Sequence, residues 1–180
     1  LGIKIVQNGD AAKDVKSLDA AGDSKAGYQY AGMPGDTVKE HVAVKSDANS
    51  KDSYIRVTIN RSWMDKDGKK DFTLSPKEIG ILRDNDSWLI AEDPEDPEVI
   101  YCYYTKKVGG DTQTESVMDS FTILKDKVTE NSNAYAGYSA NITFEADAVQ
   151  AEAGAKAMLA EWGIIAELDA EGNLTDYTEQ

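Results

Sequence analysis

One short acidic stretch carries the residue types that could hold a cation. Asp65 and Asp67 lie just ahead of Gly68, and Asp71 follows. Calcium takes about six to eight oxygen ligands, and an EF-hand loop also needs a third early acidic ligand and a late glutamate, which are missing here. Asp-Gly is at the same time a strong hairpin-turn pair. We therefore interpret the stretch as a turn and keep Asp65, Asp67 and Asp71 as candidate calcium ligands. The acidic run 92–98 could also gather calcium, but such loop carboxylates are usually solvated.

His41 is the only histidine of the chain, and this limits the catalytic chemistry that the sequence supports. A Ser-His-Asp triad would need His41 as its base, but the residue lies on the polar side of an alternating stretch and no nucleophile elbow accompanies it. A zinc peptidase of the HExxH type needs two histidines on one helix. Carboxylate pairs that cleave glycosidic bonds stay open in so acidic a chain, although no pair stands out. We predict that the protein is not an enzyme and has no catalytic or cofactor-binding residues.

A group of aromatic residues offers a different chemistry, the stacking of sugar rings. Trp63, Trp88, Tyr101, Tyr103 and Tyr104 belong to or border stretches that we expect to be strands. Aromatic residues in strands more often fill the core or form cross-strand pairs. A carbohydrate-binding platform is therefore the alternative to a purely structural role for these side chains.

The charge balance excludes two classes of partner. Acidic residues number 33 against 19 lysines and arginines, which gives a formal net charge of -14 at pH 7. A nucleic-acid-binding surface needs clustered Lys and Arg to displace counterions from phosphates, and an anionic membrane surface attracts basic segments. We expect no nucleic acid as a partner, and the simplest role of the charge is solubility.

Length and composition indicate a single β-sandwich domain over residues 1–180, with 173–180 as a candidate flexible tail. The chain has 180 residues, of which 41% are hydrophobic and 29% charged, so it is long enough and apolar enough to bury a core. Cys102 is the only cysteine, which excludes an internal disulfide and a cysteine-based metal cluster. No run approaches the roughly 18 apolar residues of a membrane span, so we expect no membrane span.

Alternating apolar and polar residues predict a mostly β protein. In the stretch 34–59, Val42 and Val44 form one such pattern and Ile55, Val57 and Ile59 form another, as half-buried strands do. Further strands are expected at 3–6, 87–90, 99–104, 121–124 and 140–146. The predicted core contains Val42, Val44, Ile55, Val57, Ile59, Ile142 and Phe144.

Two short helical segments are expected beside these strands. Ser75 and Glu78 have the spacing of a capping box, with Pro76 at the first helical position. A later segment carries apolar residues at i, i+3, i+4 and i+7, the stripe of an amphipathic helix that Gly163 can end. The stripe consists of Ala155, Met158, Leu159 and Trp162. Many strands and few helical turns predict an antiparallel β-sandwich with one or two short helices on its flank.

Several of these segments, taken in order, resemble the TasA/camelysin family of secreted proteins of Gram-positive bacteria. The resemblance starts with a Pro-Gly-Asp turn that leads into a strand pair, and it extends from Gly2 to about Gly163, nearly the whole chain. The segments that carry it are 34–38, 42–45, 53–57, 63–71, Trp88, 103–104, 148–151 and 160–163.

The resemblance implies a jelly-roll-like form of the sandwich, export from the cell, and assembly into extracellular biofilm-matrix fibres. It implies strand addition as the mode of assembly, with Leu1, Ile3 and Ile5 in the assembling element. Family members carry an aromatic-rich mature N-terminus ahead of the first strand, which is missing here. We therefore expect the chain from Leu1 to be monomeric in dilute solution and fibres to require the native N-terminus. Camelysin relatives have been described as metallopeptidases, but the histidines that a zinc site would use are absent.

The sequence thus predicts a secreted, self-associating structural subunit of a fibre in the extracellular matrix or on the cell surface of a Gram-positive bacterium. The alternative is a cell-surface adhesin or carbohydrate-binding module without catalysis, because a sandwich fold alone does not separate these functions.

Overall fold

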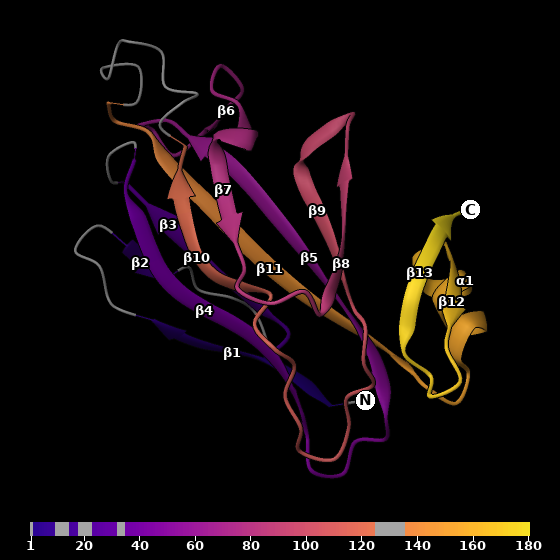
Figure 1. Cartoon of the computed structure of the whole chain (residues 1–180). Helices are drawn as coiled ribbons and strands as arrows, with labels where there is room; N and C mark the ends of the chain where they lie inside the picture. The colour runs from indigo at the N-terminus through magenta and orange to yellow at the C-terminus, as the bar shows by residue number, and fades with distance from the viewer. Residues whose placement is uncertain (1, 10–14, 18–22, 32–34, 125–135) are drawn as a thin grey trace.

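Two antiparallel β-sheets that pack face to face make up most of the chain (Figure 1). The computed structural model describes residues 2–9, 15–17, 23–31, 35–124 and 136–180. The smaller sheet has the order β1-β4-β10-β7. Its strands are β1 (Ile3–Gly9), β4 (Thr37–Ser46), β10 (Met118–Ile123) and β7 (Ile79–Leu82).

The larger sheet has the order β2-β3-β11-β5-β9-β8, and the short strand β6 pairs with β5 beside this path. Its strands are β2 (Val15–Ser17), β3 (Lys25–Tyr30), β11 (Ser139–Gln150), β5 (Ser53–Met64), β9 (Asp96–Tyr104), β8 (Trp88–Asp93) and β6 (Lys70–Asp71). The two long strands β5 and β11 pair along their whole length, from Met64 opposite Ser139 to Ser53 opposite Gln150. This mostly β, antiparallel sandwich confirms the predicted fold class.

The main core lies between the two sheets. Phe121 of the smaller sheet packs against Tyr28 and Tyr30 of the larger one, with ring centroids 6.3 and 5.4 Å apart. Side chains alternate between the two faces of a strand, so the apolar members of an alternating stretch all reach this core. The predicted core residues are confirmed, since each is at most 1% exposed: Val42, Val44, Ile55, Val57, Ile59, Ile142 and Phe144.

The strands β8 and β9 run further into the acidic run 92–98 than the sequence predicts. The carboxylates of Asp93 and Asp96 accept the backbone N–H groups of Glu95 and Glu98, at 2.9 and 3.2 Å. Such bonds from a short side chain to the backbone two residues on close a tight turn. The acidic run is therefore a hairpin between two strands rather than a long loop.

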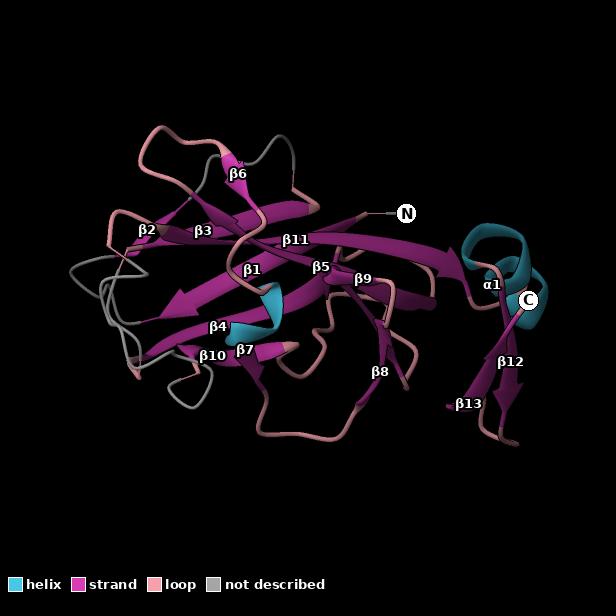
Figure 2. Cartoon of the chain, turned by 90° about the horizontal axis from the view of Figure 1, so that it is seen from above, coloured by secondary structure: helices cyan, strands magenta, loops and turns pink. Residues whose placement is uncertain are grey.

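A small C-terminal unit lies at one end of the sandwich (Figure 2). Its side chains pack on the outer face of the larger sheet. It consists of the helix α1 (Gly154–Trp162) and the hairpin of β12 (Ile164–Leu168) and β13 (Leu174–Glu179). Together with the sheet it builds a second core, in which Met158, Ile164 and Leu174 pack with the sheet residues Tyr54, Tyr103 and Val149.

The prediction of a flexible tail at 173–180 is wrong, because β13 occupies most of that range. Asp169 closes the hairpin turn by accepting the backbone N–H groups of Glu171 and Asn173, at 2.9 and 2.8 Å. Beyond the turn, Leu174 is only 2% exposed. The turn fixes the segment together with Leu174 and with Tyr177, whose ring centroid lies 4.8 Å from that of Tyr103.

Both predicted helical segments form, but only two of the four residues of the predicted apolar stripe in the second are covered. Pro76–Glu78 is a single 3-10 turn, and the Ser75 side chain accepts the backbone N–H of Lys77 at 3.3 Å. In α1, Met158 is buried and Trp162 is half-buried, whereas Ala155 and Leu159 are exposed. The helix contacts β12 and β11 along one side only, which leaves the outer part of the stripe uncovered. Gly163 ends the helix with a φ of 68°.

Within the described ranges, none of the helices has the length and apolar character that crossing a bilayer requires.

Candidate functional site

The stretch that holds the candidate calcium ligands forms the turn of the β5–β6 hairpin. Oδ1 of Asp65 accepts the backbone N–H groups of Asp67 and Lys69, both at 2.9 Å. Gly68 has a φ of 75°, which a residue without a side chain adopts at little cost. Asp65 thus uses one carboxylate oxygen to close the turn.

Asp71 directs its carboxylate to other partners. Its Oδ1 accepts the backbone N–H of Thr73 at 2.8 Å and also the Thr73 hydroxyl, and the hydroxyl of Tyr138 lies 3.4 Å from Oδ2. These hydrogen bonds, first of all the one from the Thr73 hydroxyl, lower the pKa of Asp71. Among the described residues, no group of three or more His, Cys, Asp or Glu side chains is placed to hold a metal ion.

We expect millimolar calcium to leave the melting temperature unchanged, because a ligand raises it only by binding the native state. Thermal unfolding followed by circular dichroism, with calcium and with chelator, checks this. The control variant is Asp176→Asn, a change in another hairpin. A saturable rise in melting temperature that is abolished by Asp67→Asn but kept by Asp176→Asn would show that the loop binds the ion.

His41 pairs with Asp119 across two strands of the smaller sheet. Its Nδ1 lies 3.0 Å from Oδ1 of Asp119, and its side chain is 46% exposed. Burial acts to raise the pKa of Asp119, but hydrogen bonds from the Asp84 amide and from His41 outweigh this and lower it. Within the described part of the chain, no serine hydroxyl or cysteine thiol is a hydrogen-bond partner of His41. The pair therefore lacks the nucleophile that a triad requires.

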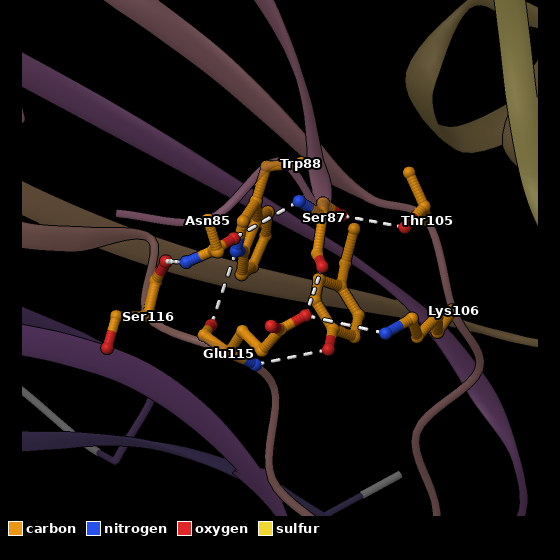
Figure 3. Close-up of polar contacts among 8 residues, drawn as sticks. Asn85, Ser87, Trp88, Thr105, Lys106, Glu115 and Ser116 are labelled. Atoms are coloured by element: carbon orange, nitrogen blue, oxygen red, sulfur yellow. Dashed lines mark hydrogen bonds and ion pairs between the residues drawn. The ribbon is translucent and has the colours of Figure 1, made fainter. Parts of the chain in front are cut away.

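A second polar network joins Ser87 to Glu115 (Figure 3). The Ser87 hydroxyl donates to the carboxylate of Glu115, and Nζ of Lys106 lies 3.4 Å from the same oxygen. The bond from Ser87, with Lys106 adding to it, lowers the pKa of Glu115. A carboxylate with a lowered pKa is a poor general base. The network links the connection between β7 and β8 to the segment before β10. The low basicity of Glu115 does not favour a role as the base in hydrolysis.

The aromatic residues considered as a sugar platform do not share a surface. Trp63, Trp88 and Tyr104 lie in the main core, and Tyr103 lies in the second core on the other side of the sheet. Consecutive residues of a strand face opposite sides, so Tyr103 and Tyr104 are necessarily separated. Tyr101 alone of the five is half-buried. The hypothesis that these five residues form a sugar-binding platform is therefore wrong.

A different aromatic site lies where α1 meets the outer face of the larger sheet. The guanidinium carbon of Arg56 lies 5.4 Å from the ring centroid of Tyr101 and 5.5 Å from that of Trp162. Its Nη2 donates to Oδ2 of Asp147 at 3.1 Å, while Nε is buried and has no hydrogen-bond partner among the described residues. We call this group of Arg56, Tyr101 and Trp162 the arginine stack.

Two cavities adjoin the arginine stack. One, of about 370 Å³, has Glu92, Asp93 and Glu179 in its wall in addition to the stack. The other, of about 460 Å³, shares Arg56 and Trp162 with the first and includes Glu161. Sequence reasoning missed this site, because Arg56 and Trp162 are far apart in the chain and meet only when the C-terminal unit packs on the sheet.

The predicted assembly residues lie on a strand at the border of the smaller sheet. β1 pairs with β4 from Ile3 opposite Ser46 to Gly9 opposite Glu40. The side chains of Ile3 and Ile5 are partly buried and pack on the main core, whereas Leu1 lies outside the described residues. β1 is thus held by one neighbouring strand, by two half-covered side chains, and by hydrogen bonds of Gly2 and Ile5 to residues outside that strand.

One cross-strand pair weakens this edge. Lys4 stands directly opposite Lys45, and like charges at such positions destabilise strand pairing. Asp111 offsets part of the repulsion, since its carboxylate lies 3.2 Å from Nζ of Lys45.

Comparison of the chain with family models, with curated proteins and with solved structures finds no match. We therefore base the functional inferences on two features of the structure, the β1 edge and the arginine stack.

Proposed function

We propose that the protein is a secreted structural subunit of a fibre in the extracellular matrix or on the surface of a Gram-positive bacterium. The observation that carries the proposal is the border position of β1, whose Ile3 and Ile5 are only partly buried on the core. In the fibre, β1 and the segment before it leave their own β4 and pair with β4 of a neighbouring copy. When each copy donates its strand to the next copy rather than exchanging strands reciprocally, and the rotation between copies does not close a ring, the contact repeats and builds a filament.

Strand exchange costs little free energy at equilibrium, because the same contacts form again between two copies. The start of β1 is fastened by three hydrogen bonds: Gly2 N–H to the Ser50 hydroxyl, this hydroxyl to Gly2 O, and Asp47 N–H to Gly2 O. The N–H of Ile5 also donates to Asp23 O at 2.7 Å. All these bonds must open before exchange, so fibres grow slowly.

The acidic surface regulates this step in the proposal. A formal net charge of -14 makes copies repel one another, and salt screens such repulsion within about 10 Å at 0.1 M ionic strength. Growth is therefore expected to be faster in salt. No catalytic step belongs to the proposed function.

Replacing Ile5 by Asp is expected to suppress fibres in a form of the protein that polymerises. The substitution puts a charge where an apolar side chain must pack on the acceptor's core, so a released β1 gains less free energy on a neighbouring copy. Light scattering and electron microscopy over a range of concentrations measure the effect, and we expect the rate of growth to fall at least about tenfold, as a loss of about 1.4 kcal/mol would produce.

The matched control is Asn8→Asp, which adds the same charge to an exposed position of the same strand. Fibres from the Ile5→Asp protein at the rate of the Asn8→Asp protein would remove β1 from the mechanism. The adhesin or carbohydrate-binding alternative would then take first place.

A further inference from the structure

The first cavity beside the arginine stack has the size and the wall of a small ligand site. Its volume of about 370 Å³ falls within the range of about 300–1,000 Å³ that is usual for ligand pockets. Tyr101 and Trp162 are each partly exposed, so aromatic surface is available to a ligand beside charged groups.

The wall carries hydrogen-bond acceptors and donors together. The carboxylates of Asp93 and Glu179 only accept, while the guanidinium of Arg56 only donates. Glu92 also borders the cavity, but its carboxylate lies 3.8 Å from Nη2 of Arg61 on the other face of the sheet. Asp147 binds Nη2 of Arg56, and Nε is buried, so a ligand can reach the guanidinium only at its terminal nitrogens. A ligand that suits this wall must both donate and accept hydrogen bonds.

The charges narrow the ligand class further. Two acidic residues, Asp93 and Glu179, line the cavity together with one guanidinium that is already paired with Asp147, so an anionic ligand is repelled. A lysine or arginine side chain has donors only and would have nothing to offer Arg56. Sugar hydroxyls both donate and accept, and the C–H face of a hexose ring packs on aromatic side chains, whose rings have one apolar body and a polar tip.

We infer that this cavity binds a hexopyranose unit of a neutral or amino oligosaccharide. Tyr101 and Trp162 supply the apolar contact, the carboxylate of Glu179 accepts hydroxyl protons, and Arg56 donates. The inference does not depend on fibre formation, since the cavity lies on the larger sheet and β1 borders the smaller one.

Intrinsic fluorescence reports on this site selectively, because Trp63 and Trp88 are buried and Trp162 is half-buried. The purified protein is titrated separately with cellotetraose, a glucosamine tetramer, a trimer of galacturonate and tetralysine. We expect a saturable change with one or both of the first two and none with the others. Tyr101→Ala and Glu179→Gln should each weaken the binding at least about tenfold. Phe72→Ala, a change at an exposed aromatic residue elsewhere, should leave it unchanged.

The glucosamine tetramer separates the two sugar classes, since only its ammonium groups gain from the acidic wall. Binding of tetralysine without either sugar would overturn the inference in favour of a basic peptide. Binding of the galacturonate trimer as tight as that of cellotetraose would overturn the charge argument. Absence of any saturable change at millimolar sugar, or binding that both Tyr101→Ala and Glu179→Gln leave intact, would refute the site. A protein that binds sugar but never polymerises would contradict the fibre proposal alone.

Discussion

Val57→Asp is expected to remove much of the protein's free energy of unfolding. Val57 lies in the middle of the larger sheet, opposite Ala146 on one side and Cys102 on the other, and its side chain is fully buried between the sheets. A carboxylate there has no partner, and an uncompensated buried charge costs on the order of 3–5 kcal/mol. Domains of this kind are stable by only about 5–15 kcal/mol, so much of the stability disappears.

Urea unfolding followed by circular dichroism measures this prediction. Asn60→Asp is the control, because it introduces the same residue at an exposed position of the same strand and should shift the midpoint little. A soluble Val57→Asp protein that unfolds cooperatively at the wild-type midpoint would contradict the assignment of Val57 to the core face.

The faces of the strands could be predicted from the sequence because a strand has a strict period of two. Ile55, Val57 and Ile59 show this period without interruption, and all three are buried. The same rule places Tyr103 and Tyr104 on opposite faces of their strand. Considering these residues only as a cluster of aromatic side chains ignores this. The hairpin interpretation of Asp65–Gly68 likewise followed from local chemistry, as the two bonds to Oδ1 of Asp65 make plain.

The C-terminal unit and the arginine stack could not be predicted in this way. The segment 173–180 has little apolar character, and β13 forms because Leu174 reaches a second core that also contains Tyr54 and Tyr103. Arg56 lies on the outer face of a strand, where polar residues are common. Trp162 comes close to the Arg56 guanidinium only because α1 packs on the sheet. Contacts between segments distant in sequence determine both features, and local periodicity carries no signal for them.

A disulfide between β1 and β4 is expected to block fibre growth completely. Lys4 and Lys45 stand directly opposite one another, and opposed residues of antiparallel strands have Cα atoms about 4.5–5.5 Å apart. This lies within the range of about 4.4–6.8 Å that a disulfide spans. Lys4→Cys combined with Lys45→Cys therefore locks β1 on its own β4 under oxidising conditions. Replacing the two lysines also removes their repulsion.

The native cysteine does not compete with this bridge. Cys102 is fully buried, and burial raises the pKa of its thiol to about 12, so it holds almost no reactive thiolate near neutral pH. The reduced double variant has the same sequence as the oxidised one and is the matched control. In a form of the protein that polymerises, we expect the reduced variant to form fibres and the oxidised variant to stay monomeric in light scattering.

The time of oxidation provides the most direct test of strand exchange. Fibres of the double variant are first grown under reducing conditions, then oxidised, dissolved in denaturant and separated by electrophoresis without reductant. If β1 of each copy pairs with β4 of the next, the disulfides join neighbouring chains, and a ladder of covalent oligomers results. If every disulfide instead lies within one chain and only monomer is found, β1 never left its own sheet and the proposed mechanism of assembly is contradicted.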